Sequence, residues 1–237
     1  MIDLHCHCVP AIDDGVRTIV EGRELLSSLC ELGFTRVVAT PHMRPGLFDN
    51  SARDIRQAYE QSRDELARGN ELQLELSCEH YFDEIVLDRV LQGEALPYPG
   101  ERAILLEFYE VDFPPHVDHT LAMLKRRGLL PVIAHPERYR AIRRDPGVLE
   151  RLLDTGAVAL LDVAALVGKY GRAAKRCAEA LLARDLYHAA CTDCHRPADV
   201  ALVAGALDWI TQQYGADEIE ALFKAGPTEV LNGRVLS

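Results

Sequence analysis

Short apolar runs alternate with longer amphipathic segments along the whole chain. Seven of these runs have the length and composition of buried strands, and they cover residues 2–4, 36–40, 72–78, 103–108, 129–134, 157–163 and 187–191. Between them, apolar residues recur at helical spacing, which predicts helices at 19–32, 52–68, 82–92, 116–127, 146–154, 172–184 and 197–214. This alternation is typical of an α/β protein with parallel strands.

Two of the expected helices carry a clear start signal. Thr18 with Glu21, and Ser51 with Asp54, have the spacing of a capping box. No linker, internal repeat or low-complexity tract interrupts the pattern, so we expect a single domain over residues 1–237. Parallel strands joined by helices form either an open doubly wound sheet or a closed barrel.

Polar residues at the strand ends help to choose between these two folds. Six of the seven expected strands end in a side chain that binds metals, namely His5 with His7, His42, Glu79, Glu107, His135, and Asp193 with His195. In a closed barrel the carboxyl ends of all strands converge on one mouth, whereas an open sheet would scatter these residues. A period of two also places His5 beside His7, and Asp193 beside His195, on one face of their strands. The placement therefore favours a barrel with a metal site at its mouth.

The seven cysteines are expected to be thiols, because the number is odd and no secretory signal precedes them. Cys6, Cys8 and Cys194 alternate with the candidate ligands, so strand parity turns them away from the mouth, where we expect small buried side chains. Cys191 and Cys194 form a C-x-x-C, but the same parity sends them to opposite faces and disfavours a redox pair.

The charge balance limits the classes of partner. The chain has 26 Lys and Arg against 37 Asp and Glu, a net charge of −11, which argues against binding nucleic acid or anionic lipid through a general positive field. A phosphate site would need a local reversal of this sign. No apolar run reaches the roughly 18–20 residues of a membrane span, so we expect a cytoplasmic protein that is not itself a membrane protein.

The ordered motifs resemble the polymerase and histidinol phosphatase (PHP) superfamily. The resemblance rests on Met1-Ile-Asp-Leu-His-Cys-His7, Asp13-Asp-Gly15, Ala39-Thr-Pro-His42, Glu79-His-Tyr81, Glu107-Phe108, Val132-Ile-Ala-His-Pro-Glu-Arg-Tyr139 and Thr192-Asp-Cys-His195. It is closest to the branch of bacterial manganese-dependent protein-tyrosine phosphatases encoded with capsule and exopolysaccharide genes (CpsB/CapC type), and it extends from Met1 to about Leu231.

The resemblance implies a distorted seven-stranded (β/α)7 TIM-like barrel with a trinuclear, usually manganese-dependent site at its C-terminal mouth. Carried over residue by residue, one ion would be held by His5, His7, Glu79 and Asp193, a second by the bridging Glu79 with Glu107 and His135, and a third by Asp14, His42 and His195. Imidazoles and carboxylates without thiolates suit Mn, Fe or Zn and do not distinguish among them.

By the same resemblance, the chain would be a phosphomonoester hydrolase that dephosphorylates a bacterial tyrosine kinase in capsular or exopolysaccharide biosynthesis. Three divalent cations against four ligand carboxylates would leave the mouth at about +2, which is the required local reversal of sign. We hypothesise that a water bridging two metals attacks the phosphorus in line. Arg138 and Arg196 are candidates to contact the phosphate because guanidinium binds it in bidentate fashion, and Arg44 is a weaker candidate.

Two alternative functions stay open at this point. One is a small-molecule phosphatase of the histidinol-phosphatase type on the same barrel. The other is a non-catalytic, metal-stabilised scaffold that binds the kinase.

Overall fold

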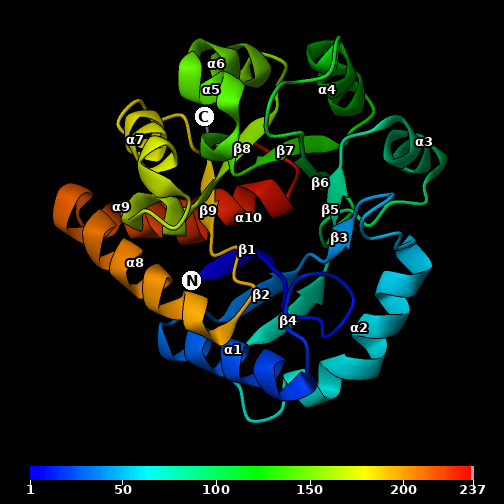
Figure 1. The fold of residues 1–237 in the computed structure, drawn as a ribbon, viewed down its shortest axis with the longest axis vertical. Helices are drawn as coiled ribbons and strands as arrows, with labels where there is room; N and C mark the ends of the chain where they lie inside the picture. The colour runs from blue at the N-terminus through cyan, green and yellow to red at the C-terminus, as the bar shows by residue number, and fades with distance from the viewer. Residues whose placement is uncertain (236–237) are drawn as a thin grey trace.

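Parallel strands lie at the centre of the molecule and helices surround them (Figure 1). The computed structural model describes residues 1–235, so the last two residues of the expected domain lie outside the described residues. One sheet contains β1 (Ile2–Cys6), β2 (Arg36–Ala39) and β4 (Gln73–Leu76), in the order β1-β2-β4. The other contains, in this order, β3 (His42–Met43), β5 (Glu79–Tyr81), β6 (Ala103–Glu107), β7 (Leu130–Ala134), β8 (Val158–Asp162) and β9 (Ala189–Cys191). All neighbouring strands pair in parallel, which confirms the predicted α/β class.

The seven expected strands correspond to nine strands within the described residues, because two of them are interrupted. The expected strand at 36–40 continues as β3 after a break at Pro41, which has no N–H to contribute to a ladder. The strand beside it breaks at the same level, between β4 and β5. Backbone bonds still cross the break, from the Ser77 N–H to the Ala39 carbonyl (2.8 Å) and from the Glu79 N–H to the Pro41 carbonyl (3.1 Å). The two sheets are therefore continuous along the chain at this point.

Backbone hydrogen bonds also join the other edges of the two sheets. The Asp193 N–H donates to the His5 carbonyl (2.9 Å), and the His7 N–H donates to the Cys194 carbonyl (3.0 Å). Cys6 and Cys194 form an isolated parallel bridge. The end of β1 thus lies beside the segment that follows β9, which brings the first and last strands together.

The helices follow the predicted pattern closely. The expected helices appear as α1 (Ile19–Glu31), α2 (Ala52–Leu66), α3 (Glu84–Gln92), α4 (Val117–Arg126), α6 (Gly147–Leu153), α7 (Gly171–Leu182) and α8 (Val200–Tyr214), the last preceded by the short helix η3 (Pro197–Asp199). Thr18 caps α1, and Ser51 with Asp54 forms a complete capping box on α2, so both start signals are confirmed.

Six further helical segments were not predicted. They are η1 (Pro136–Arg138), α5 (Arg140–Arg144), η2 (Val163–Val167), α9 (Ala216–Glu220), the π-helical η4 (Ala221–Ala225) and α10 (Gly226–Leu231). Each is at most six residues long, which is too short for apolar periodicity to reveal it.

The apolar core leaves one end of the strands free for polar residues. Val230 and Leu231 of α10 pack in the same buried cluster as Leu4, and α10 lies against the segment that leads into β9. Gly226 permits this contact, because a Cβ there would overlap the His188 carbonyl oxygen. Gly233, just after α10, lies against Arg102, so this end of the chain packs at the amino ends of β6 and β9, opposite the carboxyl ends that carry the polar residues. No helix among residues 1–235 combines the length and apolarity needed to cross a bilayer.

Candidate metal centre

The structure brings all nine predicted ligands into one connected cluster at the carboxyl ends of the strands. Potential ligand atoms lie within 4.8 Å of one another in four overlapping groups: His5, His7 and Asp193; His5, Glu79 and His135; His42, Glu79 and Glu107; and His7, Asp14, His42 and His195. His7 and His42 each belong to two of these groups. The resemblance assigns each of them to a single ion, whereas here they link the group that contains Asp14 to those that contain Asp193 and Glu79.

Glu79 lies in the middle of the cluster. Its carboxylate is 2.9 Å from both His42 Nδ1 and His135 Nε2, 3.4 Å from His5 Nε2 and 3.5 Å from His7 Nε2. Burial opposes its ionisation, but His5 and His42 outweigh this effect and hold the pKa of Glu79 well below its usual range. Glu79 is therefore an anionic group surrounded by four imidazoles, a position compatible with the bridging role that the resemblance implies.

The backbone conformation of Asp193, and not its position in a strand, places its side chain in the cluster. β9 ends at Cys191, and Asp193 adopts a left-handed conformation with φ 45°, so the expected alternation of Asp193 and His195 along a strand is wrong. Its Oδ1 nevertheless lies 3.1 Å from His5 Nε2 and 3.3 Å from His7 Nε2. His135 also has a positive φ, of 35°. Backbone strain of this kind is costly for non-glycine residues and tends to occur at functional sites.

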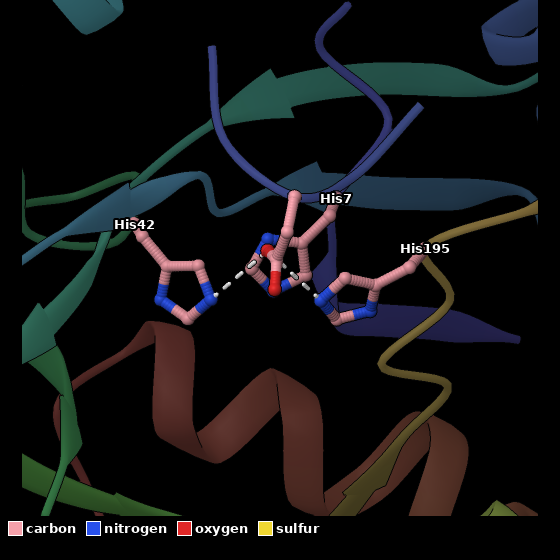
Figure 2. A group of neighbouring side chains, drawn as sticks. His7, His42 and His195 are labelled. Carbon is pink, nitrogen blue, oxygen red and sulfur yellow. Dashed lines mark ion pairs between the residues drawn. The ribbon is translucent and has the colours of Figure 1, made fainter. Parts of the chain in front are cut away.

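Three imidazoles enclose the more open side of the cluster. Figure 2 shows the rings of His7, His42 and His195 gathered around a carboxylate, and its dashed lines mark the ion pairs of His42 and His195 with the Asp14 oxygen. The Asp14 carboxylate lies 3.4 Å from the Nε2 atoms of both His42 and His195, which hold its pKa below the usual range. Because the Asp14 side chain is 55% exposed, this part of the cluster faces solvent.

Unpartnered buried atoms test whether the cluster fits a metal. Six side-chain atoms of the predicted ligands are buried and make no hydrogen bond among the described residues: His5 Nε2, His7 Nε2, His42 Nδ1, Glu107 Oε2, His135 Nδ1 and Asp193 Oδ1. The first four and the last face another atom of the cluster at 2.9–3.7 Å without forming a hydrogen bond with it. Buried polar atoms are nearly always paired, so such a concentration calls for an external partner. Imidazole nitrogens and carboxylate oxygens are the donors that Mn, Fe and Zn accept. The residues present therefore fit divalent transition metals.

Outer contacts orient the imidazoles toward the centre. His5 Nδ1 shares a hydrogen bond of 2.6 Å with the Thr40 hydroxyl, and His7 Nδ1 donates to Asp13 Oδ2 at 2.8 Å. Such contacts fix the ring and leave Nε2 for the metal. No role was predicted for Asp13 or Thr40, although both lie within the quoted motifs. Their signal was a position one or two residues before a predicted ligand, Asp14 or His42.

Gly15 shows how tightly this shell is packed. Its N–H donates to Asp13 Oδ1 at 2.8 Å, and a Cβ at this position would lie 2.6 Å from the Cβ of His7. A side chain there would have to displace His7 or Asp13.

The two predicted phosphate-binding arginines lie beside the cluster in different settings. Arg138 Nη1 donates to Asp193 Oδ2 at 2.7 Å, and the guanidinium lies 4.6 Å from the centre of the Tyr170 ring. Arg196 Nη1 donates to the carbonyls of Asp14 (2.9 Å), His195 (2.7 Å) and Gly15, so it holds the loop that carries Asp14. A direct role of either arginine in phosphate binding stays a prediction.

A second layer of polar residues beyond Arg138 was not predicted. Asp162 ends β8, is fully buried, and its Oδ2 is another atom without a hydrogen-bond partner in the described chain. Burial, strengthened by Asp193, raises the pKa of Asp162 to about 7. Lys169 and Tyr170 approach Asp193, with Lys169 Nζ 3.4 Å from its carbonyl oxygen and the Tyr170 hydroxyl 3.4 Å from its Oδ2.

The cysteines take no part in the cluster. Cys6, Cys8 and Cys194 are completely buried in the core between strands and helices, as predicted, whereas Cys191 packs in the separate inner cluster. All seven cysteines lie within the described residues and are free thiols. The C-x-x-C is therefore not a redox pair in this arrangement.

Metal binding is expected to strengthen as the pH rises. Burial lowers the pKa of His5, but Glu79 and Asp193 outweigh it and raise the pKa to about 9; for His42 the same balance, with Glu79 and Asp14, gives about 10. Metals bind neutral imidazole, so loading must displace these protons. Between pH 6.5 and 8.5 the affinity for Mn²⁺ should rise by up to about tenfold per pH unit for each proton released.

Titration calorimetry in buffers of different ionisation enthalpy measures both the affinity and the number of protons released. An affinity that is constant from pH 6.5 to 8.5, with no proton release, would contradict this prediction.

Comparison with known proteins gives a consistent result. Residues 1–232 match the family described as "Capsular polysaccharide synthesis, CpsB/CapC". The chain is 29% identical over 204 residues to the tyrosine-protein phosphatase YwqE of Bacillus subtilis, covering 82% of this chain and 77% of that protein. It is 28% identical to the tyrosine-protein phosphatase CpsB of Streptococcus pneumoniae, with 100% of both chains covered.

Comparison with solved structures gives the same result as comparison of sequences. A crystal structure from work on YwqE and CpsB, described as unique metal-dependent tyrosine phosphatases, matches 100% of this chain and 96% of its own, with a TM-score of 0.91 and 27% identity. The phosphotriesterase homology protein of Escherichia coli has a TM-score of 0.58, is 12% identical and covers 97% of this chain and 98% of its own, so it shares the fold alone.

Proposed function

The chain belongs to the CpsB/CapC family of capsular polysaccharide synthesis proteins, and we propose that it is a metal-dependent tyrosine-protein phosphatase. One observation carries the proposal. Nine imidazole and carboxylate side chains converge at one mouth, with six of their buried atoms unpartnered, in a chain that aligns over its whole length with phosphatases of this class. Hydrogen bonds between β1 and residues 193–194 support the further proposal that the two sheets form one distorted barrel around this mouth.

We propose Mn²⁺ as the metal and three ions as the full complement. The ions would be held by His5, His7, Glu79 and Asp193; by Glu79, Glu107 and His135; and by Asp14, His42 and His195. Bound divalent cations supply Lewis acidity, which polarises the phosphoryl oxygens and neutralises the charge that develops on them.

The chain's own residues would orient the phosphate and position the ester. Arg138 extends a guanidinium to the edge of the cluster, fixed by Asp193 on one side and by the Tyr170 ring on the other, and would donate to a nonbridging oxygen. Arg196 would act nearer Asp14, where it already fixes the loop. A tyrosine phenolate has a conjugate-acid pKa of about 10, so it leaves with little help from a general acid, unlike an aliphatic alkoxide.

We infer that the substrate is a tyrosine-phosphorylated protein, and a bacterial tyrosine kinase in polysaccharide export is the candidate. The names of the matched relatives, which are tyrosine-protein phosphatases within a capsule-synthesis family, support this inference.

Elemental analysis combined with phosphatase assays tests the proposal. Purified protein loaded with Mn²⁺ should hydrolyse a tyrosine-phosphorylated peptide, lose this activity when a chelator removes the metal, and regain it when Mn²⁺ is returned. Fewer than two tightly bound metal ions, with no gain from added Mn²⁺, would contradict the metal site. If histidinol phosphate is hydrolysed faster than the phosphotyrosyl peptide, the small-molecule phosphatase is favoured. If a His42→Ala variant keeps the full phosphatase activity of the wild type, the non-catalytic scaffold is favoured.

A further inference from the structure

The two sides of the mouth differ in chemistry. β3, β5 and β6 are neighbours in one sheet, and exposed or half-buried apolar and aromatic residues lie at the end of β5 and in the segments that follow β3 and β6. We call Arg44, Leu47, Phe48, Tyr81 and Tyr109 the aromatic wall. The segments that follow β7, β8 and β9, at the other end of the same sheet (Figure 1), carry the cations Arg138, Lys169 and Arg196.

A tight hairpin fixes one part of the wall to the metal cluster. The backbones of Arg44 and Phe48 exchange two hydrogen bonds, of 3.0 and 2.8 Å, and Gly46 provides the left-handed turn with φ 81°. The Phe48 ring stacks on the predicted ligand His42, with 5.2 Å between ring centroids and 8° between planes. Leu47 lies at the tip with 61% of its surface exposed. The hairpin thus holds an apolar tip in solvent directly after a ligand strand.

A cation and two tyrosines form the rest of the wall. The Arg44 guanidinium lies 4.2 Å from the centre of the Tyr81 ring, and its Nη1 is 3.6 Å from Glu107 Oε1. Tyr109 follows Glu107 by two residues and is 56% exposed. Tyr81 on β5 pairs in register with Glu107 on β6, so the segment that carries Tyr109 begins beside Tyr81. The wall therefore runs from the hairpin across β5 to the segment after β6.

We propose that the aromatic wall binds the ring of a phosphorylated tyrosine and the peptide beside it, while the phosphate lies on the metal cluster. This inference rests on the proposed function. An aryl phosphate has a dianionic end and a flat apolar body, which match the cationic and the aromatic sides of the mouth. Aromatic rings pack edge-to-face or offset, and Arg44 can interact with a ring face, so the wall suits an aryl group in particular.

The wall would also select against phosphoserine. The tyrosine ring separates the phosphorus from the peptide backbone and would cover the wall, whereas a serine ester has no ring to bury there. Leu47 and Tyr109 would then contact residues next to the phosphotyrosine, because they are the most exposed members of the wall.

Surface variants with matched controls test this inference in the Mn²⁺-loaded protein. The double variant Leu47→Ser with Tyr109→Ser removes the two exposed side chains, neither of which is a predicted ligand. The control is Val20→Ser with Tyr214→Ser, which removes similar side chains at exposed positions on α1 and α8. Three quantities are measured: kcat/KM on a tyrosine-phosphorylated peptide, the Kd of the same peptide with a non-hydrolysable phosphonate, and the inhibition constant of inorganic phosphate.

The wall variant should lower kcat/KM and weaken peptide binding by about tenfold, as the loss of one or two aromatic or apolar contacts implies. Inorganic phosphate has no ring, so its inhibition constant should change by less than about twofold. Peptide binding equal to that of the control variant would overturn the inference. An equal weakening of inhibition by inorganic phosphate would overturn the inference too, because the substitutions would then have disturbed the metal cluster rather than a binding surface for the ring. If metal-loaded wild-type protein hydrolyses no phosphotyrosyl peptide, the proposed function fails, and the phosphonate Kd still decides the role of the wall.

Discussion

Replacing Glu79 by glutamine is expected to abolish at least about 99.9% of the phosphatase activity and to release metal. Among residues 1–235, Glu79 is the one carboxylate within 3.5 Å of four imidazoles, those of His5, His7, His42 and His135. A glutamine keeps the shape but places a neutral amide, with two N–H donors, where cations would be bridged. A loss of about 4 kcal/mol of transition-state stabilisation corresponds to about a thousandfold in rate, and metal Lewis acidity contributes several kcal/mol.

The measurement pairs kcat/KM on a phosphotyrosyl peptide with elemental analysis and circular dichroism. Glu75→Gln is the matched control, because Glu75 lies four residues earlier, on β4, and pairs with Arg36 away from the cluster. It should keep both metal content and activity. Retention of all bound metal and of more than about a tenth of wild-type activity by Glu79→Gln would contradict the bridging role.

The positions of most candidate ligands were predictable because they depend on a topological rule. The carboxyl ends of parallel strands meet at one mouth, so His42, Glu79, Glu107 and His135 could be placed together from their positions along the chain alone. Asp14 lies in a loop that no periodicity describes, and only the family resemblance identified it. The family motifs thus identified a candidate ligand in a loop, which the periodicity of apolar residues could not do.

Other features could not be predicted because they depend on tertiary contacts. Asp193 belongs to the cluster, but a left-handed backbone held by a hydrogen bond to His5 places it there, and strand alternation does not. The strand that breaks at Pro41 lies beside a second strand that breaks at the same level, between β4 and β5. No local sequence signal predicts this second break. Asp13 acts through His7, and the importance of such a contact is visible only when both side chains are in place.

The distribution of charge explains how an acidic protein can receive a phosphate. The net charge of −11 spreads over the whole chain, whereas four of the carboxylates are gathered among five imidazoles where cations would be held. Arg138, Lys169 and Arg196 add fixed positive charge along one side of the mouth. A phosphate would therefore meet a local field opposite in sign to that of the surface around it.

Replacing Arg138 by lysine is expected to lower kcat/KM by about a hundredfold while the metal content stays unchanged. The guanidinium donates to Asp193 Oδ2 at 2.7 Å and stacks at 4.6 Å on Tyr170, which leaves further N–H donors in a fixed plane for a phosphate oxygen. A lysine keeps the positive charge but not the planar fork, so it cannot hold Asp193 and a phosphate oxygen in the same geometry. Losing one well-placed donor to a developing oxyanion typically costs about 10²–10³ in rate.

Arg140→Lys is the control, because Arg140 is exposed on α5 only two residues away, and it should stay within about twofold of the wild type. The inhibition constant of inorganic phosphate separates the two roles that Arg138 could have. If the arginine contacts phosphate, Arg138→Lys should weaken inhibition by phosphate along with catalysis. If it only supports Asp193, the variant should instead lose metal, and phosphate inhibition measured at saturating Mn²⁺ should return to the wild-type value. That second result would contradict a phosphate-binding role and make Arg138 a positioning residue for Asp193.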